Sequence, residues 1–157
     1  MRWSGGLGGS SRRVSLWARQ AVSYALVDTS IWLAYFNRRD SMHPRARQLV
    51  SPDLRLVTTW PIVWESVTLL SQRVSSERAV EAGMLLSEGS LAHIIEISPE
   101  DLGLTWMLMR QYAARRLSAA DATSFAVMRR RKIGTAISFH ADFALVLSDR
   151  TVLGTKE

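Results

Sequence analysis

Four acidic residues each stand where a short apolar segment gives way to the start of a helix or loop. They are Asp28, Glu65, Asp121 and Asp142. In a sheet of parallel strands such ends meet along one edge, so acids far apart in the chain can converge. Carboxylates held close together repel one another, and a hard divalent cation bound by oxygen ligands relieves that repulsion. The set therefore predicts a Mg²⁺ or Mn²⁺ site suited to cutting phosphodiester bonds, as in a metal-dependent nuclease.

Each acid also has a simpler structural interpretation. Asp28 could cap a helix, a role worth about 1 kcal/mol. Asp121 lies three residues after Ser118, which is the spacing of a capping box. Glu65 and Asp142 could be ordinary solvated side chains. We favour a shared site because all four acids recur at strand ends or first helical turns.

The segments that would position these acids alternate between strand and helix. Apolar runs predict strands at residues 24–27, 54–58, 92–97 and 135–139, with a final strand near 145–147. Helical periodicity and capping residues predict helices at 30–36, 43–49, 60–72, 76–88, 98–112 and 118–131. This alternation is typical of βαβ units around a parallel sheet. We expect one α/β domain over residues 24–153, preceded by a flexible basic Gly/Ser/Arg tail at residues 1–23.

The composition excludes several other classes of protein. The 157 residues suit one domain. Because cysteine is absent, there can be no disulfide framework and no thiolate metal site, which is consistent with a cytoplasmic protein. The three histidines show no zinc-ligand spacing, so oxygen must hold any metal. No apolar run approaches the roughly 20 residues that span a bilayer, so no membrane association is predicted.

Four motifs occur in a specific order along the chain: Val27-Asp-Thr-Ser-Ile-Trp32, Trp64-Glu-Ser-Val67, the segment 120–129 (ADATSFAVMR), and Ser138-Phe-His-Ala-Asp-Phe143. With these motifs, the chain from about Tyr24 to Leu153 resembles the PIN-domain ribonucleases, in particular the VapC-type toxins of bacterial toxin–antitoxin pairs.

The resemblance implies a three-layer α/β/α sandwich with a central, mostly parallel sheet. It also implies Mg²⁺-dependent endonucleolytic cleavage of structured RNA, either tRNA or rRNA, together with a cognate antitoxin and a homodimer as partners. Asp28, Glu65 and Asp121 match the first three acids of the family. The last motif departs from the family, because His140 stands where an acid is common, and Asp142 is the candidate to replace it.

The predicted mechanism uses one or two metal ions held by Asp28, Asp121 and Asp142. Glu65 would act as a further ligand or as the base that orients the attacking water. The predicted supporting residues, which would hold metal-bound waters or contact the phosphate, are Thr29, Ser30, Ser124 and His140.

An acidic site needs a rim of positive charge to attract RNA. The chain has a formal net charge of +6. Much of this positive charge belongs to the predicted tail, because four arginines and no acid lie within residues 1–23. Phosphate contacts whose strength falls with salt are predicted for Arg38, Arg39, Arg115, Arg116, Arg129 and Arg130.

A second hypothesis is a catalytically silent PIN-like module that binds RNA or a protein, and it is motivated by His140. Other enzymes fit poorly. A phosphatase of the haloacid-dehalogenase type would require an aspartate at Ser30, and no Gly-x-Gly-x-x-Gly follows the first strand to bind a dinucleotide.

Overall fold

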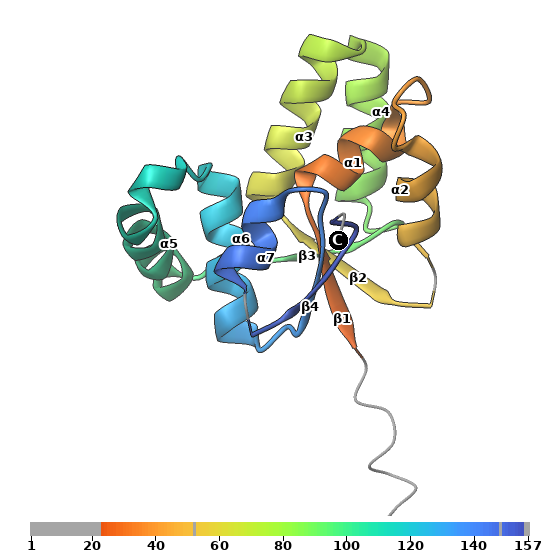
Figure 1. Ribbon diagram of the computed structural model, residues 1–157. Helices are drawn as coiled ribbons and strands as arrows, with labels where there is room; N and C mark the ends of the chain where they lie inside the picture. Colours follow the sequence, from red (N-terminus) through yellow and green to blue (C-terminus); the bar gives the residue numbers. More distant parts are fainter. Residues whose placement is uncertain (1–22, 52, 148, 156–157) are drawn as a thin grey trace, which may run out of the picture.

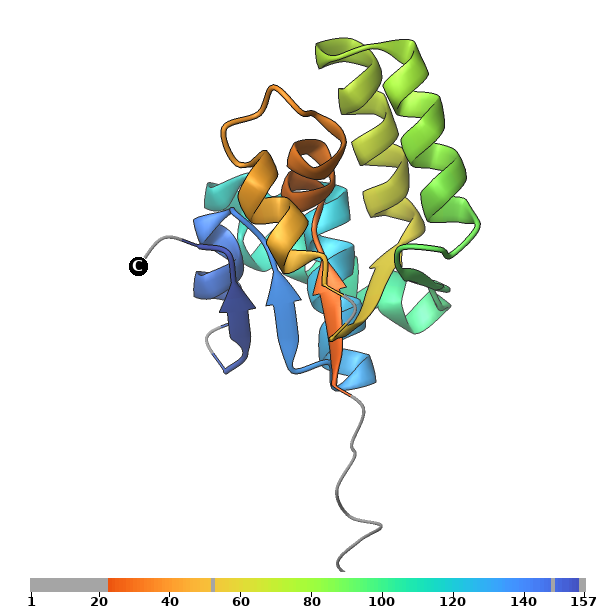
Figure 2. The same cartoon turned by 90° about the vertical axis from the view of Figure 1, so that its right-hand side faces the viewer.

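A computed structural model describes residues 23–51, 53–147 and 149–155 of the chain. The predicted tail, apart from Ser23, lies outside these residues. Within them, five strands form one parallel sheet in the order β3-β2-β1-β4-β5, and the arrows in Figure 2 point the same way. The strands are β1 (Tyr24–Val27), β2 (Arg55–Thr59), β3 (His93–Ile95), β4 (Thr135–Ile137) and β5 (Thr151–Leu153).

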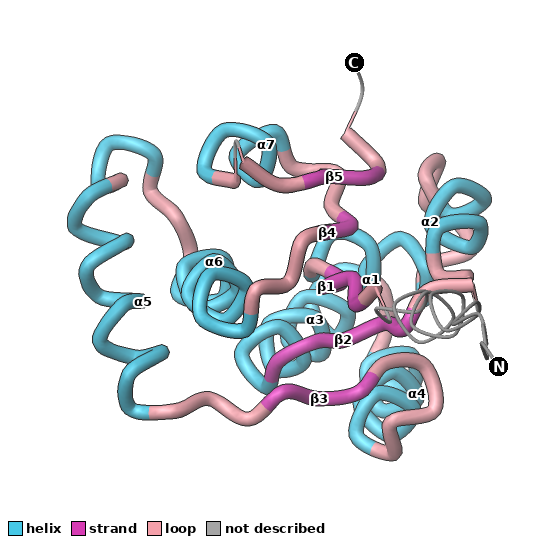
Figure 3. The backbone as a smooth tube through the Cα atoms, turned by 90° about the horizontal axis from the view of Figure 1, so that it is seen from below, coloured by secondary structure: helices cyan, strands magenta, loops and turns pink. Residues whose placement is uncertain are grey.

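Helices cover both faces of the sheet (Figure 1). The described α-helices are α1 (Thr29–Phe36), α2 (His43–Leu49), α3 (Trp60–Arg73), α4 (Ser76–Ser87), α5 (Pro99–Gln111), α6 (Ala119–Arg131) and α7 (Ala141–Val146). Seen along the sheet, α5 and α6 lie on one side and α2 and α4 on the other (Figure 3). The predicted three-layer α/β/α sandwich is confirmed. Among the described residues no helix is long and apolar enough to cross a bilayer.

The central strand β1 is buried on both faces, which explains its unbroken apolar sequence. Ala25, Leu26 and Val27 have no exposed surface. The helix that follows buries Ile31 and Trp32, while α6 buries the run from Ala122 to Met128. Because apolar packing fixes both sides of the junction between β1 and α1, Asp28 at that junction has a defined position.

The register brings the carboxyl ends of three strands together. Val27 of β1 pairs with Ile137 of β4, and Leu26 pairs with Val57 of β2. The residues that follow β1 and β4 are therefore neighbours, although more than a hundred residues separate them in sequence. This edge of the sheet is where the predicted site should lie.

The prediction of a final strand near 145–147 is wrong. Residues 141–146 form α7, and the fifth strand is Thr151–Leu153, which pairs with β4. The apolar side chains explain the difference. Phe143, Val146 and Leu147 are buried at helical spacing, whereas Leu145 is exposed, and a strand would bury Leu145 and Leu147 on one face.

The six predicted helices begin and end within one residue of the helices in the structure. The N-cap of α4 is Ser75, whose side chain accepts a hydrogen bond from the backbone N of Arg78. Helix α6 ends at Arg131, and its C-cap Lys132 has the left-handed conformation.

Candidate active site

Asp28 is the most constrained of the candidate acids. It follows β1, caps α1 and is only 1% exposed. Its Oδ2 accepts hydrogen bonds from the backbone N of Ser30 at 3.2 Å, from Ser30 Oγ at 2.7 Å and from Ser138 Oγ at 2.9 Å. Within the described part of the chain all hydrogen bonds to its carboxylate reach Oδ2, so Oδ1 remains available to a further ligand. The capping role and a metal-binding role are therefore compatible.

Ser138 is a site residue that the sequence prediction missed. It directly follows β4, is fully buried, and joins Asp28 to the loop before α7 because its Oγ also accepts the backbone N of His140 at 3.0 Å. Ser30 makes a similar link, since its Oγ accepts the backbone N of Phe139 at 3.0 Å. The position of Ser138 directly after a strand is the same signal that identifies Asp28.

Glu65 is oriented by Thr29. Thr29 Oγ1 donates a hydrogen bond to Glu65 Oε2 at 2.5 Å, which connects the first turn of α1 to α3. Glu65, Leu69 and Arg73 follow one another at intervals of four residues, so they share one face of α3. That face lines the cavity described below.

Asp121 lies in the first turn of α6, in the predicted capping box. The Ser118 side chain accepts the backbone N of Asp121, and the Asp121 carboxylate accepts the backbone N of Ser118. Burial, followed by the negative charges of Asp28 and Glu65, raises the pKa of the Asp121 carboxyl to about 6. Nearby His140 and the Ser118 backbone oppose that change. The charges of Asp28 and Glu65 therefore act on the Asp121 carboxyl in addition to its burial.

A cavity of about 430 Å³ brings these elements together. Thr29, Ser30, Glu65, Asp121 and His140 all line it. The prediction that distant acids converge at the sheet edge holds for three of the four acids, because Asp28 contacts the cavity-lining Ser30 and its charge acts on Asp121.

Two arginines line the same cavity. Arg116 was predicted as an RNA contact, and its backbone has a positive φ of 52°, a conformation that residues other than glycine rarely adopt. Arg73 was not predicted as an RNA contact. Its position could have been inferred, because it lies two helical turns beyond Glu65.

His140 lies at the mouth of the cavity. Its Nδ1 is 3.9 Å from Asp28 Oδ2, and its side chain is 58% exposed. A ring in this position can reach a molecule that enters the cavity from solvent.

Other predicted residues are not part of this cavity. Asp142 lies in the first turn of α7, not in a loop, and its Oδ1 is 3.1 Å from Arg115 Nη1, with both side chains more than two-fifths exposed. Ser124 is buried, and its Oγ donates to the carbonyl of Ala120. Arg130 forms a salt bridge with Asp101, a fully buried acid, with 2.9 Å between Nε and Oδ1.

The remaining predicted RNA contacts occupy two different places. Arg38 and Arg39 line a neighbouring cavity. Arg129 is exposed on the last turn of α6.

The chemistry of the acids fits a hard divalent cation. Among the described residues, no group of three acid, histidine or cysteine side chains is arranged as a complete metal-binding cluster. Mg²⁺ does not need one, since it is usually bound by one or two carboxylates together with waters and substrate phosphates. Asp28 Oδ1 accepts no hydrogen bond from the described residues. A cation would offset the burial and the neighbouring negative charges that raise the pKa of Asp121.

The fold and this acid-lined cavity at the carboxyl ends of parallel strands define a class of protein. Residues 25–146 match the family model of the PIN domain. The chain belongs to the PIN-domain family of nucleases.

Among individual relatives, the chain is 32% identical over 119 residues to the 23S rRNA-specific endonuclease VapC20 of Mycobacterium tuberculosis, which covers 75% of this chain and 90% of that protein. The crystal structure of M. tuberculosis VapC20, described as a Sarcin-Ricin loop cleaving toxin, matches with a TM-score of 0.72 and 31% identity. That match covers 78% of this chain and 94% of the other. A toxin–antitoxin complex from Klebsiella pneumoniae has the same fold, with a TM-score of 0.53 and 23% identity over 76% of this chain and 90% of the other. The predicted resemblance to VapC-type toxins is confirmed.

Proposed function

We propose that this protein is a Mg²⁺-dependent endoribonuclease that cleaves structured ribosomal RNA and acts as the toxin of a toxin–antitoxin pair. The observation that carries the proposal is the convergence of three acids: Glu65 and Asp121 line one cavity, and Asp28 contacts the cavity-lining Ser30. Burial, followed by the charges of Asp28 and Glu65, raises the pKa of Asp121. Ribosomal RNA is the favoured substrate because VapC20, the relative with 32% identity, is named as a 23S rRNA-specific endonuclease. We assign the catalytic domain to residues 24–153.

Asp28 Oδ1 and the Asp121 carboxylate would hold the ion. A bound Mg²⁺ supplies charge stabilisation to the phosphate and lowers the pKa of water. Glu65, fixed by Thr29, is placed to orient the attacking water and accept its proton. His140, exposed at the mouth of the cavity, is placed to contact the phosphate or to protonate the leaving 3′-oxygen. Mn²⁺ has the same preference for oxygen ligands and should substitute for Mg²⁺.

The role of Asp142 follows from its position. Because Asp142 pairs with Arg115 outside the cavity, we assign the metal ion to Asp28 and Asp121 and do not assign Asp142 as a metal ligand. Arg115 and Asp142 would then shape the approach to the cavity from the α7 side.

The partners of the proposed toxin are a cognate antitoxin and a second copy of the chain. The Klebsiella pneumoniae structure with the same fold is itself a toxin–antitoxin complex, which supports an antitoxin partner. The homodimer rests on the family resemblance alone.

The test is cleavage of a synthetic RNA hairpin with the sarcin–ricin loop sequence, together with mapping of cleavage ends on total RNA. We expect cleavage with Mg²⁺, none with EDTA, and none with the Asp28→Asn variant. An inactive wild type that Mg²⁺ does not activate, and that binds RNA as well as Asp28→Asn does, would instead support the catalytically silent module. Cleavage that persists in EDTA would contradict the metal mechanism.

A further inference from the structure

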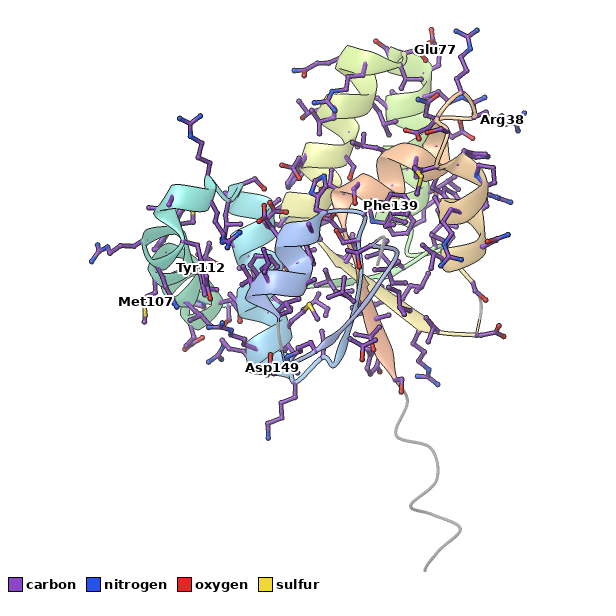
Figure 4. The ribbon with its side chains drawn as sticks, in the orientation of Figure 1. Arg38, Glu77, Met107, Tyr112, Phe139 and Asp149 are labelled. Carbon is purple, nitrogen blue, oxygen red and sulfur yellow. The ribbon has the colours of Figure 1, made fainter. Side chains whose placement is uncertain are left out.

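Four arginines line a second cavity, of about 560 Å³, beside the candidate active site. We call it the arginine cavity, and its arginines are Arg38, Arg39, Arg73 and Arg78. Two come from the loop between α1 and α2, one from the last turn of α3 and one from the first turn of α4. Figure 4 shows Arg38 at the end of the molecule where α3 and α4 meet. Two segments distant in sequence, residues 38–39 and 73–78, thus place cations around one hollow.

The arginine cavity adjoins the acidic cavity through Arg73, which lines both. Glu65 and Arg73 lie on the same face of α3, two helical turns apart. The loop between α1 and α2 also contributes to both cavities, since Asp40 lines the acidic one and Arg39 the other. A ligand that leaves the acids along this face of α3 therefore enters the arginine cavity.

The charges of these arginines are largely unneutralised by the described part of the protein. Arg78 pairs with Glu81, but no described carboxylate lies within 4.0 Å of a side-chain nitrogen of Arg38, Arg39 or Arg73. The negative C-terminal end of α3 stabilises the charge of Arg73. No such stabilisation is available to Arg78, because it lies in the first turn of α4, where the helix dipole disfavours a cation. An anionic ligand would stabilise all four positions.

The lining favours a phosphodiester backbone over an acidic protein segment. Besides the arginines the cavity presents Asn37 and the N-cap Ser75, and its apolar side chains are Phe36 and Val74. Phe36 is buried in the core and Val74 is exposed, so the described lining offers one small apolar side chain instead of the large apolar pocket that anchors a protein partner. Guanidinium groups form bidentate hydrogen bonds to phosphate oxygens, and the positive N-terminus of α4 further attracts an anion.

We propose that the arginine cavity binds the phosphates of the RNA strand next to the scissile bond, so that the substrate runs from the acids past Arg73 toward Arg38, Arg39 and Arg78. This inference rests on the proposed nuclease function. It makes Arg38 and Arg39, on an exposed loop, substrate-binding residues, whereas Arg73 would contact the phosphate nearest the acids.

The test compares two double variants that lose the same charge. Arg38→Ala/Arg39→Ala alters the arginine cavity, while Arg45→Ala/Arg55→Ala removes two exposed arginines from α2 and from the start of β2, at the opposite end of the strand from the site. Binding of a fluorescently labelled synthetic RNA hairpin is measured by anisotropy against salt, in Asp28→Asn protein so that no cleavage occurs. Circular dichroism confirms that both variants fold.

We expect the cavity variant to bind RNA about tenfold more weakly and to lower the salt slope by about two, since each lost phosphate contact removes about one. The control should change both quantities far less. In active protein the cavity variant should raise the KM for hairpin cleavage by a larger factor than it lowers kcat.

Equal losses in the two double variants would overturn the inference, as would tighter binding of polyglutamate than of the hairpin, which would assign the cavity to an acidic protein segment. The outcomes separate this inference from the proposed function. Mg²⁺-dependent cleavage with an unaffected cavity variant refutes the inference alone, whereas arginine-dependent RNA binding without cleavage refutes the nuclease alone.

Discussion

Replacing Asp121 by asparagine should stabilise the metal-free protein while abolishing its activity. The pKa of the Asp121 carboxyl is raised from 3.8 to about 6, so the folded state holds this proton more tightly than the unfolded chain does. For an acid with a raised pKa, stability is fully present below the unfolded value and is lost as pH rises through the folded value. Since one pKa unit is worth about 1.4 kcal/mol, the ionised carboxylate costs about 3 kcal/mol near neutral pH.

Asparagine removes that cost and keeps the capping hydrogen bond, because its side-chain oxygen can still accept the backbone N of Ser118. The free energy of unfolding of Asp121→Asn should therefore exceed that of the wild type by about 3 kcal/mol near pH 7.5 and by only about 1 kcal/mol near pH 4.5. Urea unfolding in EDTA, followed by tryptophan fluorescence at both pH values, measures the difference. Adding Mg²⁺ should stabilise the wild type and leave the variant unchanged.

The matched control is Asp142→Asn, which removes an exposed acid outside the cavity and should change stability by no more than about 0.5 kcal/mol at either pH. A variant at position 121 that is destabilised near pH 7.5, or whose advantage does not shrink at the lower pH, would refute the claim that burial and the neighbouring acids destabilise the ionised Asp121 carboxylate in the folded protein.

Three further substitutions have distinct expected outcomes. Ser138→Ala removes the buried hydrogen bond to Asp28, which should lower the free energy of urea unfolding by about 1 kcal/mol and the cleavage rate about tenfold. Thr29→Val leaves Glu65 without its orienting donor, so kcat for the hairpin should fall while RNA affinity by anisotropy stays the same; weaker RNA binding would count against that assignment. Arg130→Ala leaves the buried Asp101 poorly paired and should cost about 2 kcal/mol, with cleavage per folded molecule retained; lost RNA affinity at unchanged stability would instead support the predicted RNA contact.

Most of the architecture could be predicted because its strands are short apolar runs buried on both faces. The segment 145–147 was misassigned because a short apolar run fits a strand or a buried helix equally well. The exposure of Leu145, the packing of Phe143 against Phe125 and the pairing of Thr151–Leu153 with β4 distinguish the two.

The site was predictable where topology alone fixes the neighbours. Asp28 stands at a strand end whose position follows from a parallel sheet, and the same reasoning applied to the residue after β4 identifies Ser138. Asp121 follows no strand, and its capping-box spacing to Ser118 predicts only its place in the first turn of α6. The partner of Arg130 could not be predicted, because its contact with Asp101 depends on how α5 packs against α6. Asp142 failed to join the other acids because α7 turns it toward Arg115.

The central claim, that Asp28 and Asp121 hold one metal ion beside Glu65, is tested most directly by anomalous diffraction from crystals grown with Mn²⁺. We expect a peak in the acidic cavity within bonding distance of Asp28 Oδ1 and the Asp121 carboxylate, and no such peak in crystals of Asp121→Asn. A cavity without Mn²⁺ in protein that cleaves RNA under the same conditions, or an ion bound only elsewhere, would contradict the claim.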